Sequence, residues 1–181
     1  MKITKIKKTG SGKYNLILDN NEKIVTYDNV ILNNDLLFKN EIDNNLYQKL
    51  NQDTNYYNIY NKCVKLIGIR LRSEKEINEY LEKNNVTDIL KEKIVSELKT
   101  QKLINDEKFA KAFILDKINF NNYGPLKIKK LLAEHNIEDN IINSELSKID
   151  SEIYYEKIKK IVDKIASTYI IQGYLDILSM K

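Results

Sequence analysis

The sequence predicts a mainly α-helical protein, in which tandem three-helix repeats form an elongated, curved solenoid behind a small N-terminal antiparallel β meander. Alternation of apolar and polar residues between turn sequences is confined to the first 27 residues, and it indicates short strands. Beyond residue 58 the apolar residues follow helical spacing, and one stretch recurs at an offset of 51 residues. Together these patterns predict a small sheet followed by helical repeats.

Residues 2–27 are expected to form three strands. Two turn sequences, Gly10-Ser11-Gly12 and Asp19-Asn20-Asn21-Glu22, divide this segment. Between the turns, Tyr14, Leu16 and Leu18 alternate with the residues beside them. Three strands joined by tight turns form a meander, and a sheet this small needs another element to pack on.

The next segment changes period. Apolar residues between Asp28 and Leu50 favour one or two short helices. Residues 51–58 are polar and rich in Asn and Tyr, so we expect a linker or the start of a helix there. We place a first domain at 1–50, made of the meander and these short helices.

The repeat is the main organising feature of the rest of the chain. Its apolar positions pair along a whole unit: Ile77 with Ile128, Leu81 with Leu132, Val86 with Ile137, Leu90 with Ile141, Val95 with Leu146 and Leu98 with Ile149. The expected helices lie near 56–70, 73–84 and 88–102 in the first unit, and near 106–121, 125–135 and 139–149 in the second. We therefore predict repeat 1 at 51–105, repeat 2 at 106–150 and a truncated repeat 3 at 151–181.

Helix ends support the same alignment. Ser73, with Glu76 three residues later, is a capping box. Gly124 before Pro125 is an alternative helix start. The pairs Asn84-Asn85 and His135-Asn136 fall where each helix should end, at positions that favour residues tolerant of positive φ. In repeat 3, Tyr154, Ile158, Ile161, Ile165 and Tyr169 are spaced for one helix.

Composition limits the possible functions. The net charge of +4 and the isoelectric point near 8.8 permit contact with nucleic acid without demanding it. No apolar stretch reaches the roughly 18 residues of a membrane span, and the N-terminus is unlike a signal peptide, so we expect a cytoplasmic protein. The single cysteine, Cys63, excludes an internal disulfide and is expected to be a buried, inert thiol.

No pattern in the sequence indicates catalysis. Acidic residues are scattered among lysines at helical spacing and never pair in an apolar setting. Gly10-Ser11-Gly12 lacks the lysine and helix of a phosphate-binding loop. His135, the single histidine, is expected to be a turn residue rather than a metal ligand. We therefore expect a non-enzyme without a cofactor.

Two candidate recognition sites are basic. Arg70 and Arg72 are the only arginines of a lysine-rich chain, and a guanidinium grips a carboxylate or phosphate with two parallel hydrogen bonds. Because capping should engage Ser73 and Glu76, we expect both arginine heads to be free for a partner, with Lys75 beside them. The alternative, local ion pairs with Glu74 and Glu76, stays open.

The second basic group lies further along the chain and consists of Lys117, Tyr123, Lys127, Lys129 and Lys130. Lys127 and Lys130 are three residues apart and therefore share one helix face. Lysines beside an aromatic ring can hold a phosphate backbone and stack on a base. An ordinary solvated face of a lysine-rich protein gives the same pattern, so both interpretations remain.

These motifs resemble the RecX regulatory protein family. The family pattern has an R-x-R-S-x-x-E run, matched by residues 70–76, then a G-[YLF]-I-[DN]-D-x-x-[FY]-A run, matched by residues 102–110, and a glycine that opens the next helix, matched by Gly124. The likeness covers about 56–150, and some members also have an N-terminal sheet. Lys102 and Asn136 stand where the family has glycine, and Asn105 replaces an aspartate but can still cap a helix.

The resemblance implies a regulator that binds the RecA recombinase filament on single-stranded DNA. Such a protein would lie along the filament groove as a monomer, bridge neighbouring subunits, and lower ATP hydrolysis and strand exchange. The residues by themselves leave two other classes open. One is a nucleic-acid-binding module that acts without RecA, and the other is an adaptor for a different protein.

Overall fold

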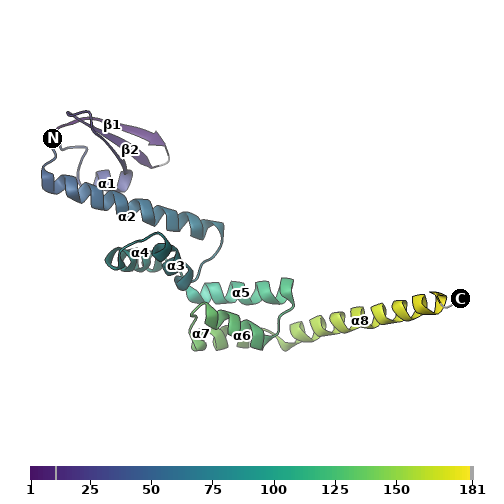
Figure 1. The fold of residues 1–181 in the computed structure, drawn as a ribbon. Helices are drawn as coiled ribbons and strands as arrows, with labels where there is room; N and C mark the ends of the chain where they lie inside the picture. Colours follow the sequence, from purple (N-terminus) through teal and green to yellow (C-terminus); the bar gives the residue numbers. More distant parts are fainter. Residues whose placement is uncertain (11, 180–181) are drawn as a thin grey trace. The chain divides into compact units, whose positions relative to one another are not determined.

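The computed structural model describes residues 1–10 and 12–179, with side chains as far as Asp176. These residues form a three-stranded antiparallel sheet followed by helices α1 to α8 (Figure 1). The predicted fold class, mainly helical behind an N-terminal meander, is confirmed. No helix within the described ranges is long and apolar enough to cross a membrane.

The strands follow the predicted meander. They are β1 (Ile3–Gly10), β2 (Lys13–Leu18) and β3 (Lys23–Tyr27), with β2 in the centre. Leu16 of β2 pairs with Ile6 on one side and Ile24 on the other. Of the predicted first turn, Ser11 lies outside the described residues. At Gly12, φ is +70°, in the left-handed region that glycine adopts without strain, so glycine suits the position.

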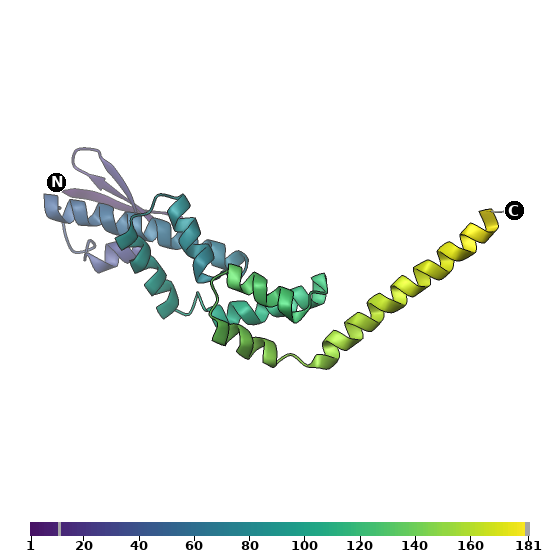
Figure 2. The same ribbon diagram turned by 60° about the horizontal axis from the view of Figure 1, so that its bottom comes forward.

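Two helices cover one face of this sheet (Figures 1 and 2). They are α1 (Asp28–Asn33) and α2 (Asn44–Ile69). Leu16, Leu18 and Ile24 of the sheet pack with Val30 of α1 and Leu50 of α2 in one buried cluster. The apolar face that the alternating strands create is thereby removed from water.

The expectation of a linker or helix start at 51–58 is wrong. Helix α2 begins at Asn44, where the Asp43 carboxylate accepts a hydrogen bond from the Leu46 amide at 2.7 Å, and it runs through this segment without a break. The polar residues have partners on the sheet side. The hydroxyl groups of Thr54 and Thr26 lie 2.7 Å apart in a hydrogen bond. Contacts with the sheet therefore override the weak helix propensity of this stretch.

The later helices fall close to the predicted ranges. They are α3 (Glu74–Lys83), α4 (Asp88–Thr100), α5 (Asp106–Asn121), α6 (Pro125–Glu134), α7 (Asp139–Ser147) and α8 (Ser151–Ser179). Gly124 and Pro125 open α6 as predicted. In α5 the Asn105 side chain accepts a hydrogen bond from the Lys108 amide at 2.8 Å, so Asn105 is the cap.

Helices α3 and α6 end in the same way. Asn85 and Asn136 have φ of 53° and 57°, as the sequence predicts for these turns. The next residue then donates its amide back to the helix, from Val86 to the Leu81 carbonyl and from Ile137 to the Leu132 carbonyl. This hydrogen-bond pattern is the Schellman motif, in which a left-handed residue allows the chain to leave the helix. The repeat therefore extends to backbone geometry.

The contacts divide the chain into two compact units. One holds Met1–Arg70 and Tyr80–Leu103, and the other holds Leu71–Glu79 and Ile104–Lys181. In the second unit, α5, α6 and α7 enclose a buried cluster of Phe109, Ala110, Ile114, Ile118, Ile128, Leu132, Ile137 and Ile142. The division into domains at 50, 105 and 150 stays a proposal.

Helix α8 is a single helix that passes through Gly173. Tyr154, near its start, packs against the cluster of the second unit. Most of its other apolar side chains are exposed, from 41% for Ile161 to 74% for Tyr169. The predicted helix is therefore confirmed. Most of the apolar side chains that share its face are exposed to solvent.

Candidate partner-binding surface

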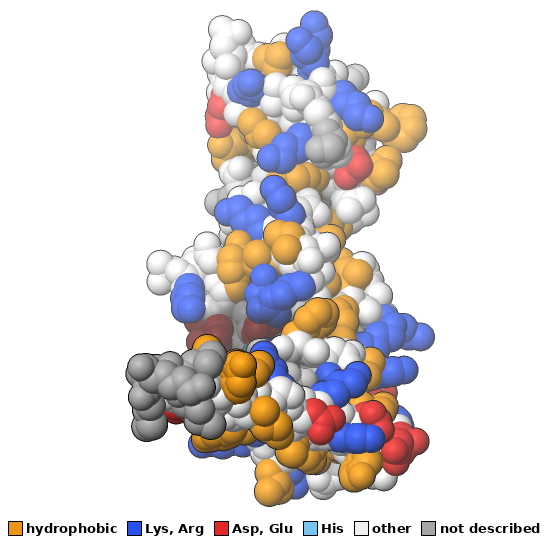
Figure 3. Space-filling model, turned by 90° about the vertical axis from the view of Figure 1, so that its right-hand side faces the viewer, with side chains coloured by type: hydrophobic (Ala, Val, Ile, Leu, Met, Phe, Trp, Pro, Cys, Tyr) orange, Lys and Arg blue, Asp and Glu red, His pale blue; other side chains and the backbone are white. Residues whose placement is uncertain are grey.

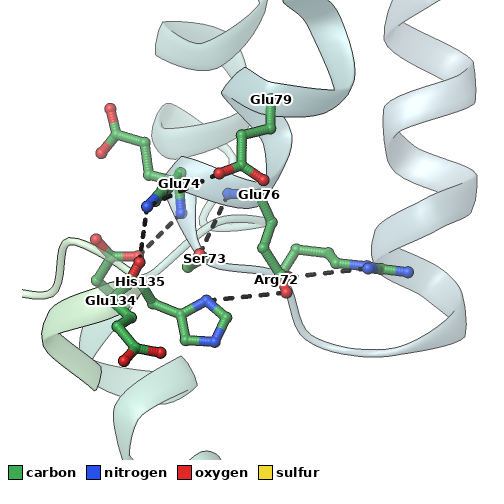
Figure 4. A network of polar contacts seen from close by, with 9 residues as sticks. Arg72, Ser73, Glu74, Glu76, Glu79, Glu134 and His135 are labelled. Carbon is green, nitrogen blue, oxygen red and sulfur yellow. Dashed lines mark hydrogen bonds and ion pairs between the residues drawn. The ribbon is translucent and has the colours of Figure 1, made fainter. Parts of the chain in front are cut away.

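The start of α3 is held by two side chains, of which Figure 4 labels Ser73. The Ser73 hydroxyl accepts a hydrogen bond from the Glu76 amide at 3.3 Å, as the predicted capping box requires. The Asp106 carboxylate accepts one from the Glu74 amide at 3.1 Å. A carboxylate at a helix N-terminus also complements the helix dipole. Asp106 thus stabilises α3, a role that its position at the start of α5 conceals in the sequence.

Glu76 stands between two bases at this helix start (Figure 4). Its carboxylate lies 3.8 Å from the Arg72 guanidinium and 3.9 Å from Nδ1 of His135. The His135 ring in turn packs beside both Phe109 and Phe113, with ring centres 5.1 and 5.3 Å away. The expectation of a free head is therefore wrong for Arg72, because its guanidinium forms a local ion pair.

Arg72 nevertheless retains hydrogen-bonding capacity. Its side chain is 23% exposed, and its buried Nε has no hydrogen-bond partner among the described residues. A guanidinium has five N–H donors, and one carboxylate at 3.8 Å uses few of them. Arg70, by contrast, ends α2 in extended backbone and is exposed. Arg70 also takes part in an interaction within the chain.

Lys75 joins α3 to the end of α6. Its ammonium donates a hydrogen bond to the Glu134 carbonyl at 2.7 Å and lies 3.8 Å from the Glu79 carboxylate. Glu134 is the last residue of α6, whose final carbonyls have no partner within the helix. The lysine supplies that partner and suits the negative end of the dipole. Lys75 therefore has a structural role in addition to its predicted one.

The second basic group lies at the opposite end of α6. We call Lys117, Tyr123, Lys127 and Lys130 the basic–aromatic surface. The Lys127 ammonium lies 3.6 Å from the centre of the Tyr123 ring, and that of Lys117 lies 4.9 Å from the centre of the Phe113 ring. Lys127 and Lys130 are exposed. Of the predicted group, the structure therefore brings Lys127 onto Tyr123, whereas Lys117 packs on Phe113.

Lys129 has a different environment. Its ammonium donates a hydrogen bond to the Asn143 side chain at 3.1 Å and lies 3.7 Å from the Asp139 carboxylate, both on α7. It therefore bridges α6 and α7 and points away from the face that Lys127 and Lys130 share. Lys129 therefore has a structural role, and Lys117 likewise has a local partner, since its ammonium lies 3.8 Å from the Asp116 carboxylate.

The N-terminus of α6 differs from the other described helix starts. No side chain caps Gly124, and the first turn holds no acidic residue. In the remaining described helices an acidic residue lies in the first turn or, in α2, at the cap. The first amides of α6 thus point out beside Lys127, an arrangement suited to an anion.

Sequence reasoning missed two exposed apolar side chains of the second unit, Phe120 near the end of α5 and Leu126 in the first turn of α6. Phe120 is 81% exposed and Leu126 is 86% exposed. Phe120 lies two positions beyond the buried Ile118, which places it on the far side of α5. A helical projection of the sequence could have found it. Figure 3 shows one face of the molecule, on which basic and apolar side chains are interleaved.

The cysteine, the possible metal ligands and the histidine of the chain indicate no reactive site among the described residues. Cys63 is fully buried, and desolvation raises the pKa of its thiol to about 11, which keeps it protonated near neutral pH. No group of three metal-ligating side chains occurs within the described part of the chain. His135 ends α6, as expected for a turn residue.

The chain is similar to proteins of known family. Residues 105–146 match the model of a family described as RecX, second three-helix domain. A regulatory protein RecX from Streptococcus agalactiae is 31% identical over 96% of this chain and 72% of its own length. One from Oceanobacillus iheyensis is 29% identical over 68% of this chain and 46% of its own length, so the chain spans less than half of that relative.

Solved structures agree with these matches. A crystal structure of a regulatory protein RecX matches with a TM-score of 0.78 and 24% identity, and the match covers 93% of this chain and 83% of that one. At that identity the match supports the fold alone. A crystal structure of RecX from Lactobacillus salivarius has a TM-score of 0.59 and 26% identity, and it covers 63% of this chain and 74% of its own. The two bacterial relatives and the first of these structures are named as regulatory proteins.

Proposed function

This chain belongs to the RecX regulatory protein family, and on that premise we propose that it binds the RecA filament on single-stranded DNA and inhibits its ATPase and recombinase activities. Similarity to the streptococcal relative over nearly the whole chain carries the proposal. We further propose that the chain acts as a monomer in the cytoplasm, without a cofactor and without catalysis of its own.

The basic–aromatic surface supports contact with the DNA-bound filament. Lys127 and Lys130 lie beside the uncapped start of α6, where backbone amides and the helix dipole favour a phosphate or a carboxylate. Leu126, in the same first turn as Lys127, adds exposed apolar surface. Lys75 binds the carbonyl of Glu134 at the other end of α6, and Glu134 lies about 10 Å from Lys127 along the helix axis. Two separate basic groups would give the chain two points of contact.

The decisive measurement is ATP hydrolysis by the cognate RecA on single-stranded DNA, with this protein titrated in at fixed salt. We expect inhibition at substoichiometric ratios. Replacing Lys127 and Lys130 together by alanine should weaken filament binding about tenfold or more if both are desolvated at the interface. The matched control is Lys108→Ala with Lys111→Ala, two exposed lysines on α5 of the same unit. The control should inhibit like the unmodified protein.

The arginine pair is tested in the same assay. Arg70→Ala with Arg72→Ala should weaken filament binding by about 2 to 4 kcal/mol if both are central contacts. Because Arg72 pairs with Glu76, the thermal stability of this variant must be measured beside its affinity. Unchanged affinity with a lower melting temperature would mean that the pair is structural and that the partner binds elsewhere.

A direct nucleic-acid-binding module is the second candidate, favoured by the same lysines and Tyr123. It predicts tight binding to bare single-stranded DNA. The logarithm of the binding constant should fall linearly with the logarithm of the salt concentration, by about 0.7 for each phosphate contacted. Such binding, with no effect on the RecA ATPase at stoichiometric excess, would replace the filament proposal. No effect in either assay would point to an adaptor for another protein.

A further inference from the structure

A hollow in the first unit takes no part in the function proposed above. It has a volume of about 400 Å³ and lies between α1, α2 and α4. That volume falls within the roughly 300–1,000 Å³ of ordinary ligand sites. The residues around it are polar or aromatic: Asn29, Asn33, Asp53, Tyr56, Tyr57, Tyr60, Lys93, Glu97 and Gln101.

Three tyrosines of α2 form one wall of this hollow. The rings of Tyr56 and Tyr60 stack at 5.9 Å with planes 15° apart, and Tyr57 stands nearly perpendicular to both. The Tyr57 hydroxyl accepts a hydrogen bond from Asn33, and that of Tyr60 donates one to Gln101 at 2.6 Å. The rings are therefore held in place, and an ordered wall of this kind binds a ligand at low entropic cost.

This wall already attracts a cation of the chain itself. The Lys93 ammonium lies 4.6 Å from the centre of the Tyr56 ring, within the range of a cation–π interaction. Lys93 is an exposed side chain on α4. The electron-rich tyrosine faces of the hollow thus favour positive charge.

The charged groups of the hollow favour positive charge as well. Asp53 and Glu97 are half-buried, and their hydrogen bonds within the described residues come from side-chain amides, those of Asn34 and Gln101. Among the described residues, no Lys, Arg or His nitrogen lies within 4 Å of either carboxylate. Two acids face one lysine, so the hollow carries a net negative charge. A partly desolvated carboxylate without a counter-ion is stabilised by any cation that enters.

The tyrosine hydroxyls do not change this balance. Burial and the nearby Glu97 charge raise the pKa of Tyr56 to about 12 and also raise the pKa of Tyr60. Both hydroxyls therefore stay neutral at physiological pH, where they can donate and accept hydrogen bonds. A phosphate or a nucleotide would meet two carboxylates here and is disfavoured.

We propose that this hollow binds an arginine side chain presented by a partner protein. A guanidinium is planar, so it can stack on a tyrosine face, and its paired N–H groups can bridge to a carboxylate in the same plane. Lysine offers neither property. The site would add a point of contact that binds a positively charged side chain of a protein, and it is distinct from the basic–aromatic surface. The proposal does not depend on which protein supplies the arginine.

The test uses the whole chain and a small probe, N-acetyl-arginine N-methylamide, followed by ¹H–¹⁵N NMR. We expect saturable shifts of amides in α1, α2 and α4 around Asn33, Tyr57 and Glu97, with a dissociation constant on the order of 1 mM for so small a ligand. The matched probe is the citrulline analogue, which has nearly the same shape without the charge. It should bind at least tenfold more weakly.

Isosteric variants locate the site. Glu97→Gln and, separately, Asp53→Asn keep a side chain that can accept the hydrogen bonds of Gln101 and Asn34, and each should weaken arginine binding at least fivefold. Glu92→Gln, an exposed acid on the same helix α4, removes the same charge outside the hollow and should bind like the unmodified protein. Equal shifts with both probes, or unchanged binding by both hollow variants, would overturn the proposal.

Discussion

At the scale of single residues, backbone geometry explains one departure from the family pattern. Lys102 stands where the family has glycine, and its φ is 56°, in the left-handed region. It follows α4, where the Leu103 amide donates back to the Leu98 carbonyl in the same Schellman motif that ends α3 and α6. Asn85 and Asn136 meet this requirement as asparagines, whereas a lysine adopts it under strain.

Lys102→Gly should therefore stabilise the protein. Relief of about 1–2 kcal/mol of left-handed strain is partly offset by the greater freedom of glycine in the unfolded chain, so the free energy of unfolding should rise by about 0.5–1 kcal/mol. Urea unfolding measures this difference. Lys102→Ala removes the same charge but keeps the strain and should give no gain. A gain of equal size for both variants would attribute the effect to charge.

Burial of Tyr56 makes stability depend on alkaline pH. Burial, and then the charge of Glu97, raises the pKa of this hydroxyl from 10.0 to about 12 in the folded state. Above pH 10 the unfolded chain loses the proton first, so the stability that Tyr56 contributes is complete below about pH 10 and is lost as the pH rises toward 12. Tyr56→Phe should flatten the fall in unfolding free energy between pH 9.5 and about 11.5.

Comparison of this variant with the unmodified protein isolates the tyrosine, because Cys63 titrates in the same range in both. Urea midpoints at several pH values are sufficient. If the two proteins lost stability in parallel, the Tyr56 hydroxyl would not be the group responsible.

At the scale of elements, sequence reasoning succeeded where a signal was local. The meander, the capping box at Ser73, the Gly124-Pro125 start and the turns at Asn85 and Asn136 each depend on a few neighbouring residues. It failed where the structure of a segment depends on contacts with residues far away in the sequence. Residues 51–58 are helical because Thr54 and its neighbours meet the sheet, and Asp106 caps α3 because two distant segments meet. Neither pairing is visible along the sequence.

The candidate sites follow the same rule. The sequence identified the lysines around Tyr123, since aromatic and basic residues stand close together there. It could not tell that Lys129 is engaged by α7, or that Glu76 would hold Arg72. The residues that line the hollow between α1, α2 and α4 are spread from Asn29 to Gln101. No short stretch of sequence could therefore predict it.

Helix α8 should contribute little to stability. Tyr154 packs on the cluster of α5, α6 and α7, and Lys157 donates a hydrogen bond to the Asn119 carbonyl of α5. Beyond these two residues, the described apolar side chains of α8 are largely exposed. A chain that ends at Lys160 should therefore melt within about 2 °C of the full chain. Calorimetry at low protein concentration measures this shift. A drop of several degrees would show that the rest of α8 packs on another surface.

At the scale of the whole molecule, each unit contains a buried apolar cluster, one under the sheet and one enclosed by α5, α6 and α7. Leu132 is fully buried in the cluster of α5, α6 and α7. Leu132→Ala should destabilise that unit by about 2–5 kcal/mol. Amide hydrogen exchange should then speed up in α5 to α7, while the amides of β2 in the first unit keep their protection.

Leu50→Ala is the reciprocal control, because Leu50 is fully buried in the cluster under the sheet. It should expose β2 and spare α6. Loss of protection in both units with either variant would mean that the chain unfolds as one cooperative body.

The interleaving of the two units along the chain bears on its synthesis. The first unit needs Tyr80–Leu103 in addition to Met1–Arg70, and the intervening Leu71–Glu79 belongs with residues that follow Ile104. On the ribosome, the sheet and α2 emerge first but cannot complete their unit until Leu103 has left the exit tunnel. At about 5–20 residues per second, the 33 residues after Arg70 impose a delay of a few seconds, during which the partly assembled first unit is a natural client for chaperones.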